Sequence, residues 1–187
     1  MNTRDAVALI DAAVRGHSGV WADVGAGAGT FTCALVELLD ATSRIYAVDR
    51  DRRAIAELER WSAASAPNVI PVVADFTTAA FELPQLGDTP LDGILLANAL
   101  HFVRDADAVL ARLVALLRPG GRVVLIEYDR REASRWVPYP IPMDRLPSLA
   151  AAAGLTKPTV TATRPSEFQG VLYAAVAEKR AAAPRLS

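Results

Sequence analysis

The stretch Val20-Trp21-Ala22-Asp23-Val24-Gly25-Ala26-Gly27-Ala28-Gly29-Thr30-Phe31-Thr32 decides the fold of this 187-residue chain. Its pattern predicts a short apolar strand, a turn of alternating glycines and a helix over 30–39. Glycine permits a positive φ and lets a ligand approach the backbone closely, because it has no Cβ. The helix aims its unpaired N–H groups and the positive end of its dipole at the same place. This order of elements predicts a nucleotide-binding site in an open α/β sheet.

The spacing of the glycines separates two classes of nucleotide. The dinucleotide fingerprint is G-x-G-x-x-G/A. Its third small residue is replaced by Thr30 when counted from Gly25, and by Thr32 when counted from Gly27. The chain instead has an acid, Asp23, one further residue and then G-x-G-x-G. A pyrophosphate disfavours a nearby carboxylate, whereas the ammonium group of a methionine tail suits one. The arrangement resembles the first motif of the class I S-adenosylmethionine-dependent methyltransferases; an ordinary tight turn is the alternative.

The composition is that of a globular chain with neither a nucleic-acid nor a membrane pattern. Hydrophobic residues make up 52% of the chain, and its formal net charge of −1 offers no basic field for nucleic acid. No apolar run approaches the ~18 residues of a membrane span. Cys33 is the only cysteine, which excludes an intramolecular disulfide. We expect a cytoplasmic, metal-free single domain over 1–187, with an N-terminal helix within 1–19, a core over 20–179 and a frayed tail over 180–187.

The second predicted strand, 44–49, ends in an acid twenty residues beyond Gly29. Asp49 is therefore placed to accept hydrogen bonds from both hydroxyls of a ribose. Hydrogen bonds to a charged group contribute roughly 1.5–3 kcal/mol each. The alternative is that Asp49 or Asp51 caps the helix expected over 52–63. We favour the ribose role for Asp49, because the glycine turn lies upstream.

The third predicted strand, 68–75, is followed by a pair suited to a nucleobase. Asp75 can accept a hydrogen bond from an adenine amino group, and the ring of Phe76 can stack on the base. The alternative is an acid in a turn beside an aromatic residue of the core. Pro71 removes a backbone donor from this strand and therefore predicts an edge position. The segment over 77–90 is expected to be a loop.

The fourth predicted strand, 91–98, is a nearly continuous apolar run, which is typical of a buried parallel strand. Ligands bind at the carboxyl ends of such strands. Asn98 is therefore a candidate contact for the methionine part of the cofactor, and His101 a candidate for the methyl-accepting pocket. A single histidine is more often structural, so both interpretations of His101 stay open. A helix follows and ends near Leu117, before Arg118-Pro119-Gly120-Gly121.

The last third of the chain departs from the simple alternation of strands and helices. A fifth strand is expected over 122–128, and Glu127 stands near its end. The segment over 130–142 is rich in proline and is therefore expected to be irregular. Its Trp136 and Tyr139 either form a wall of the substrate site or cover the core. A helix over 144–153 and two antiparallel strands over 158–164 and 170–178 complete the prediction.

Five β/α units followed by an antiparallel strand pair resemble the class I methyltransferase fold over about residues 20–179. The resemblance implies a doubly wound α/β fold with helices on both faces of a seven-stranded, mostly parallel sheet. The implied strand order is 3-2-1-4-5-7-6, with strand 7 antiparallel. The implied cofactor is S-adenosyl-L-methionine. Carried over onto this chain, the cofactor-binding residues are Asp23, Gly25, Ala26, Gly27, Gly29, Thr30, Asp49, Arg50, Asp75, Phe76 and Asn98.

The residues after the fourth strand restrict the chemical class of the methyl acceptor. Family members that methylate exocyclic amines of bases or amide nitrogens often have Asn/Asp-Pro-Pro-Tyr/Phe there, whereas this chain has Asn98-Ala99-Leu100-His101. We therefore expect a small-molecule acceptor and no nucleic acid or membrane partner. The reaction is a direct in-line displacement that leaves S-adenosyl-L-homocysteine. If the acceptor must lose a proton, His101 is the first candidate base, since histidine exchanges protons near neutral pH. Glu127 is the second, and the expected substrate residues are His101, Glu127, Trp136 and Tyr139.

Two other functions compete with methyl transfer. One is a non-catalytic partner or sensor that binds S-adenosylmethionine, because few residues before the first strand are available to cover the pocket. The other is an NAD(P)-dependent oxidoreductase, which Thr30 disfavours. A homodimer, in which a second subunit closes an open pocket, is a further possibility that the sequence leaves open.

Overall fold

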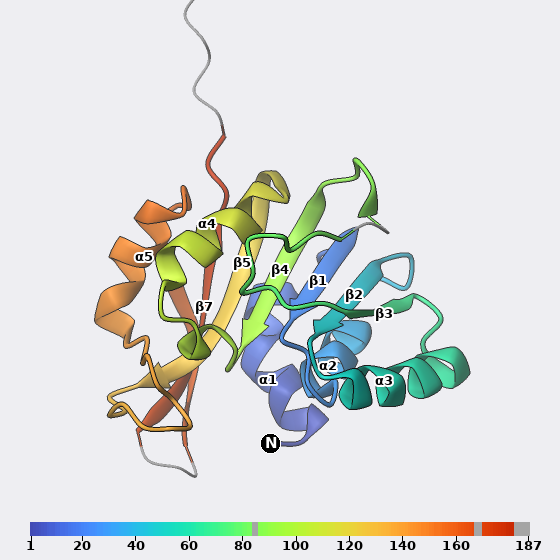
Figure 1. Cartoon of the computed structure of the whole chain (residues 1–187), viewed down its shortest axis with the longest axis horizontal. Coiled ribbons are helices and arrows are strands. Elements are labelled where there is room, and N and C mark those ends of the chain that lie inside the picture. Colours follow the sequence, from blue (N-terminus) through green and yellow to red (C-terminus); the bar gives the residue numbers. More distant parts are fainter. Residues whose placement is uncertain (84–85, 167–169, 182–187) are drawn as a thin grey trace, which may run out of the picture.

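The computed structural model describes residues 1–83, 86–166 and 170–181. In this part of the chain, seven strands form one sheet in the order β3-β2-β1-β4-β5-β7-β6 (Figure 1). β1, β2, β3, β4 and β5 are parallel, whereas β7 runs antiparallel to both β5 and β6. The predicted strand order and the antiparallel seventh strand are therefore confirmed. The strands are β1 Val20–Val24, β2 Arg44–Asp49, β3 Val69–Val73, β4 Leu91–Ala97, β5 Leu117–Asp129, β6 Thr159–Pro165 and β7 Val171–Glu178.

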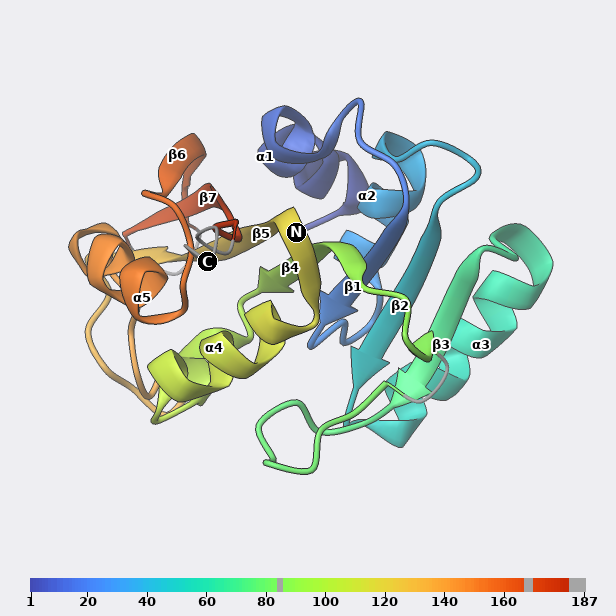
Figure 2. The ribbon, with the colours of Figure 1, turned by 90° about the horizontal axis from the view of Figure 1, so that it is seen from above.

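Helices cover both faces of the sheet, as the predicted doubly wound fold requires. Figure 2 shows α1 and α2 on one side of the sheet and α4 and α5 on the other. Two clusters of buried side chains correspond to these faces, one shared with α1, α2 and α3 and one with α4 and α5. The α-helices are α1 Thr3–Val14, α2 Thr30–Leu38, α3 Arg52–Ser65, α4 Ala106–Ala115 and α5 Leu146–Ala152, and the short 3-10 helices are η2 Leu100–Phe102 and η3 Met143–Arg145.

Strand alternation decides which side chains of β1 meet which helices. Successive side chains of a strand point to opposite faces of the sheet. Val20, Ala22 and Val24 accordingly pack in the cluster of α4 and α5, whereas Trp21 packs in the cluster of α1, α2 and α3. Asp23 shares the face of Trp21 and meets α2 there, through a hydrogen bond from Thr32.

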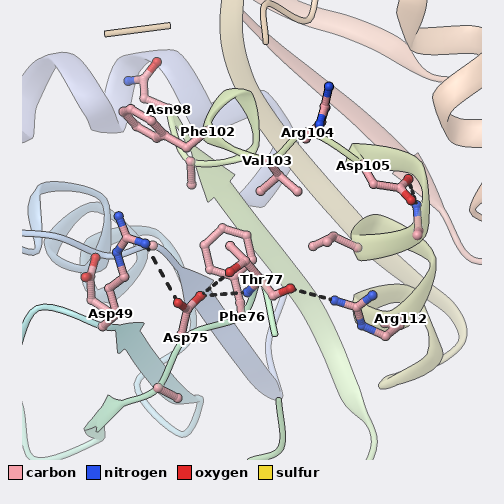
Figure 3. Close-up of a pocket in the computed structure, with 16 residues that line it drawn as sticks. Asp49, Asp75, Phe76, Thr77, Asn98, Phe102, Val103, Arg104, Asp105 and Arg112 are labelled. Carbon is pink, nitrogen blue, oxygen red and sulfur yellow. Dashed lines mark hydrogen bonds and ion pairs between the residues drawn. The ribbon is translucent and has the colours of Figure 1, made fainter. Parts of the chain in front are cut away.

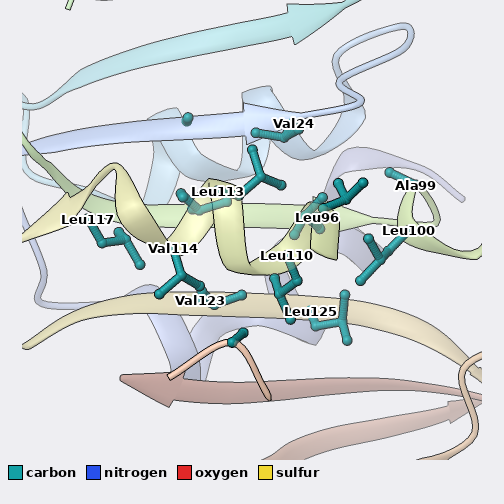
Figure 4. Close-up of a cluster of buried hydrophobic side chains, with 14 of the residues drawn as sticks. Val24, Leu96, Ala99, Leu100, Leu110, Leu113, Val114, Leu117, Val123 and Leu125 are labelled. Atoms are coloured by element: carbon teal, nitrogen blue, oxygen red, sulfur yellow. The ribbon is translucent and has the colours of Figure 1, made fainter. Parts of the chain in front are cut away.

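The core beneath α4 holds the part of the chain that follows β4. Leu110, Leu113 and Val114 of α4 are buried against leucine and valine side chains of β4 and β5 (Figure 4). Leu100, in η2, belongs to the same cluster and is fully buried. The connection between β4 and α4 is therefore anchored in the core at both of its ends.

Several element boundaries differ from those expected. β5 begins at Leu117 instead of residue 122, because Leu117 already pairs with Leu91 and a register shift absorbs the intervening residues. The expected C-terminal helix begins as η3, and only Leu146–Ala152 is α-helical. Within the described ranges, β3 pairs only with β2, so Pro71 lies in an edge strand as predicted. Most of the expected frayed tail, 182–187, lies outside the described residues.

Within those described ranges, no helix is both long enough and apolar enough to cross a lipid bilayer.

Candidate active site

A cavity of about 640 Å³ opens at the carboxyl ends of β1, β2 and β4 (Figure 3). This volume is within the range of small-molecule sites, about 300–1,000 Å³. One wall comes from the glycine turn and the ends of β2 and β3, and the other from the connection between β4 and α4 and from α4 itself. The lining residues are Gly25, Asp49, Arg50, Ala74, Asp75, Phe76, Thr77, Asn98, Ala99, Phe102, Val103, Arg104, Asp105, Ala108, Val109 and Arg112.

The glycine turn brings the backbone of β1 against the opposite wall. The N–H groups of Gly25 and Ala26 donate to the carbonyl of Val48, at 2.8 and 2.9 Å, which ties the turn to β2. Gly25 has a φ of +81°, and a Cβ at this position would lie 2.6 Å from the Cβ of Ala99. Both the conformation and the close approach therefore require glycine at this point of the cavity.

Two acids near the carboxyl end of β2 were both candidates for the cap of the next helix, and the structure separates them. Asp51 is the N-cap of α3 and accepts a hydrogen bond from the N–H of Arg53 at 2.8 Å. Asp49 lines the cavity instead. Its Oδ2 accepts from the N–H of Gly27 and its Oδ1 from the N–H of Asp51, each at 2.8 Å. Because a carboxylate has about four acceptor positions, Asp49 keeps capacity for two further donors.

The acid after β3 belongs to a small polar network at the cavity wall. Asp75 accepts hydrogen bonds from the hydroxyl and the N–H of Thr77, at 2.6 and 2.9 Å, and Arg50 lies 3.8 Å away. The hydroxyl of Thr77 is the main cause that lowers the pKa of Asp75, and Arg50 acts in the same direction. Arg112 of α4 donates to the carbonyls of Thr77 and Thr78, which joins the two walls. Phe76 also lines the cavity, and Figure 3 shows it between Asp75 and Arg112.

Asn98 stands at the end of β4 in an unusual state. Its φ is +53°, in the left-handed region, and its N–H donates to the carbonyl of Ile126 at 2.9 Å. Its side-chain oxygen is buried and has no hydrogen-bond partner in the described part of the chain. A buried acceptor without a donor is costly. Asn98 therefore offers a position that a ligand N–H group would satisfy.

Asp23 lies beneath the turn and is not a lining residue of the cavity. It is 1% exposed, and its Oδ2 accepts from the hydroxyl of Thr32 at 2.6 Å. Burial raises the pKa of this carboxyl to about 7, and the nearby Asp49 acts in the same direction. Four other predicted cofactor residues of the turn, Ala26, Gly27, Gly29 and Thr30, also lie outside the cavity lining.

The predicted substrate residues are not among the lining residues either. His101 and Glu127 are 2% and 0% exposed and contact each other, with Nδ1 of His101 2.5 Å from Oε2 of Glu127. Trp136 is 64% exposed, and its ring contacts the guanidinium of Arg135. Tyr139 is 37% exposed, and its N–H donates to the carbonyl of His101.

The structure adds lining residues that sequence reasoning missed. Phe102 is 52% exposed and, with Arg104, lies beyond the end of β4 (Figure 3). In the sequence, only their position next to His101 indicated that Phe102 and Arg104 could line the cavity. No sequence pattern indicated Arg112, because its contact with the cavity wall depends on how α4 packs against the loop after β3.

The comparisons with known proteins agree with this geometry. The family model described as "Methyltransferase domain" matches residues 22–123, more than half of the chain. The chain therefore belongs to the methyltransferase domain family, and its fold is that of the class I enzymes, which use S-adenosylmethionine as cofactor. Among the described residues, no three His, Cys, Asp or Glu side chains form a group that could hold a metal ion.

Solved structures resemble almost the whole chain. The 1,6-didemethyltoxoflavin-N1-methyltransferase of Burkholderia thailandensis, solved with 1,6-didemethyltoxoflavin and S-adenosylhomocysteine bound, is 26% identical with a TM-score of 0.75. The match covers 96% of this chain and 78% of that one. Human N-acetylserotonin methyltransferase, in complex with SAM, is 18% identical with a TM-score of 0.67, over 97% of this chain and 52% of that one, and shows the fold alone.

Curated relatives match shorter stretches. The ribosomal RNA small subunit methyltransferase H of Aromatoleum aromaticum is 42% identical over 78 residues, which are 42% of this chain and 24% of that protein. The fumosorinone synthetase of Cordyceps fumosorosea is 32% identical over 108 residues, 57% of this chain and 3% of that protein. The chain thus spans a quarter or less of the length of both relatives.

Replacing Gly25 by alanine is expected to lower both stability and affinity for S-adenosylhomocysteine. The left-handed conformation costs a residue with a Cβ about 1–2 kcal/mol, and the new Cβ also displaces Ala99. Gly16→Ala is the matched control, since Gly16 has the same φ of +81° and nothing within 4 Å of its Cβ position. Chemical unfolding should show a loss for both variants, whereas calorimetry should show weaker binding for Gly25→Ala alone. Equal affinities would contradict the role given to Gly25.

Proposed function

We propose that this protein transfers a methyl group from S-adenosylmethionine to a small-molecule acceptor. The observation that supports this most strongly is the juxtaposition of Asp49 and Asn98 at one cavity. Asp49 has acceptor capacity to spare for two hydroxyl groups, and the buried side-chain oxygen of Asn98 accepts from no donor among the described residues. A ribose and an ammonium group, held by one molecule, fit these two positions.

The remaining cavity residues complete the proposed cofactor site. Asp75 and Phe76 are suited to the amino group and the ring of adenine, and Arg50 lies beside Asp75. Gly25 lines the cavity and lets the turn lie close to Ala99 on the opposite wall. Asp23, Ala26, Gly27, Gly29 and Thr30 then act mainly by shaping and supporting this turn, although direct contacts predicted from the family resemblance stay predictions.

The cofactor, when bound, supplies a methyl group on a sulfonium centre, and its transfer leaves S-adenosylhomocysteine. The protein's contribution is to orient the reactants and to exclude water from the cavity. Orientation alone contributes on the order of 7–11 kcal/mol in favourable cases. Among the described residues, three carboxylates line the cavity, Asp49, Asp75 and Asp105, and each of them accepts hydrogen bonds from the chain.

The acceptor side of the cavity fits a small molecule. Phe102 presents an exposed aromatic ring beside Asn98, and Arg104 adds a cation at the same rim (Figure 3). The Burkholderia relative named above also has a small molecule as its bound substrate. The net charge of −1 is a further argument against a nucleic-acid acceptor. A cytoplasmic location and a homodimer stay predictions from the sequence.

Calorimetry with S-adenosylhomocysteine and, separately, with NAD tests the proposed cofactor. We expect saturable binding of S-adenosylhomocysteine and no binding of NAD at millimolar concentration. Binding of NAD alone would overturn the proposal in favour of an oxidoreductase. Incubation with methyl-labelled S-adenosylmethionine and a metabolite extract then tests transfer. Label retained wholly on the cofactor would favour a non-catalytic binding protein.

A further inference from the structure

A fully buried carboxylate links the end of β5 to the segment that follows β4. Glu127 is 0% exposed. Its Oε1 accepts hydrogen bonds from the N–H groups of Leu100 and His101, each at 3.1 Å. Its Oε2 lies 2.5 Å from Nδ1 of His101. Both oxygens of Glu127 are therefore used by η2, which begins three residues after the end of β4.

The hydrogen bonds to Glu127 matter for stability because the carboxylate is buried. Burying a carboxylate is costly unless hydrogen bonds compensate for the lost water. Glu127 meets this requirement with donors from one short segment, and Ile126 next to it accepts the N–H of Asn98. The segment after β5 adds a further hydrogen bond, from the N–H of Tyr139 to the carbonyl of His101. Residues 98–101 are thus held by hydrogen bonds along most of their length.

The same segment forms one wall of the proposed cofactor site. Asn98 and Ala99 both line the cavity. Ala99 lies so close to Gly25 that even one added methyl group would collide with it. A small displacement of this segment would therefore change the gap at Gly25 and move the side-chain oxygen of Asn98, which has no partner in the described part of the chain.

His101 is poorly placed to act on a substrate directly. Its side chain is 2% exposed, it does not line the cavity, and its Nδ1 is engaged by Glu127. We propose that His101 and Glu127 are positioning residues that hold Asn98 and Ala99 in the geometry required for cofactor binding, instead of a base that removes a proton from the acceptor. This inference rests on the proposed function, because it assumes that the cavity binds S-adenosylmethionine.

Binding of S-adenosylhomocysteine tests the inference without knowledge of the acceptor. Calorimetry is carried out on the wild type, His101→Ala, His101→Asn, Glu127→Ala and Glu127→Gln. The amide nitrogen of asparagine can take the place of Nδ1 and donate to Glu127, but asparagine cannot act as a base. Glutamine keeps an acceptor oxygen for the N–H groups of Leu100 and His101.

A positioning role predicts a rescue by the conservative variants. His101→Ala and Glu127→Ala should weaken the binding of S-adenosylhomocysteine about tenfold or more, because they remove hydrogen bonds to a buried charged group that hold Asn98 and Ala99 in place. His101→Asn and Glu127→Gln should stay within about threefold of the wild type, since they keep hydrogen bonds at these positions. A base predicts instead that all four variants bind like the wild type.

Controls separate positioning from a general loss of stability. Val124 lies on the same strand as Glu127 and is fully buried against the opposite face of the sheet. Val124→Ala should lower the unfolding temperature without changing affinity. If Glu127→Ala does not fold, the comparison of His101→Ala with His101→Asn still distinguishes a positioning role from a role as a base. A wild type that does not bind S-adenosylhomocysteine overturns the proposed function, whereas a binding wild type with unaffected variants overturns the positioning role alone.

Discussion

Replacing Asp49 by alanine is expected to weaken the binding of S-adenosylhomocysteine at least about 100-fold. Two hydrogen bonds from ribose hydroxyls to a carboxylate contribute roughly 1.5–3 kcal/mol each, and every 1.4 kcal/mol corresponds to about tenfold in affinity. Asp49 also accepts the N–H of Gly27, so its loss loosens the turn that faces the ligand. Calorimetric titration of the purified variant measures the effect directly.

Asp51→Ala is the control for this experiment. It removes a carboxylate only two residues away, at a position outside the cavity lining. Because Asp51 caps α3, the variant should lose about 1 kcal/mol of stability and keep the affinity of the wild type. A small effect of Asp49→Ala, or an equal effect of the two substitutions, would remove Asp49 from the proposed ribose site.

Asp23 should make the protein less stable as the pH rises from acidic to neutral. Burial raises the pKa of this carboxyl from 3.8 to about 7. Between these values the folded protein holds a proton that the unfolded chain has lost. The contribution of Asp23 to stability is therefore greatest below pH 4, falls as the pH increases towards 7 and is level above it. At about 1.4 kcal/mol per unit, the total is on the order of 4 kcal/mol.

Asp23→Asn isolates this contribution. Asparagine is close in shape, can still accept the hydroxyl of Thr32 and has no charge to bury. Denaturant unfolding at pH 5 and pH 8 should show that the wild type loses about 3 kcal/mol more than the variant between the two conditions. His17, whose pKa burial lowers, acts in the opposite direction but is present in both proteins. Parallel pH profiles would show that Asp23 is ionised in the folded protein.

The acids at the strand ends show how far sequence reasoning reached. The position of Asp49 at the end of β2 and of Asp75 after β3 follows from local patterns, and both carboxylates line the cavity. Asp23 was grouped with them because it precedes the glycines. In the parallel pair of β1 and β2, however, Asp23 lies level with Ala47, two residues before Asp49. Thr32 of α2 covers its side chain there, and Asp23 is 1% exposed. Two residues along the direction of the strands thus separate a carboxylate that α2 covers from one that lines the cavity.

The sequence by itself determined the order of the elements, the glycine turn and the acids at the carboxyl ends of β2 and β3, because these depend on hydrophobic period and on turn residues that are neighbours in the chain. The tertiary structure decided which side chains reach the cavity. It brought Glu127 to His101 across 26 residues and Arg112 to Thr77 across 35, and it left Trp136 exposed to solvent. Such contacts depend on the packing of whole elements, since the direction and burial of a side chain are set by neighbours that lie far away in the sequence.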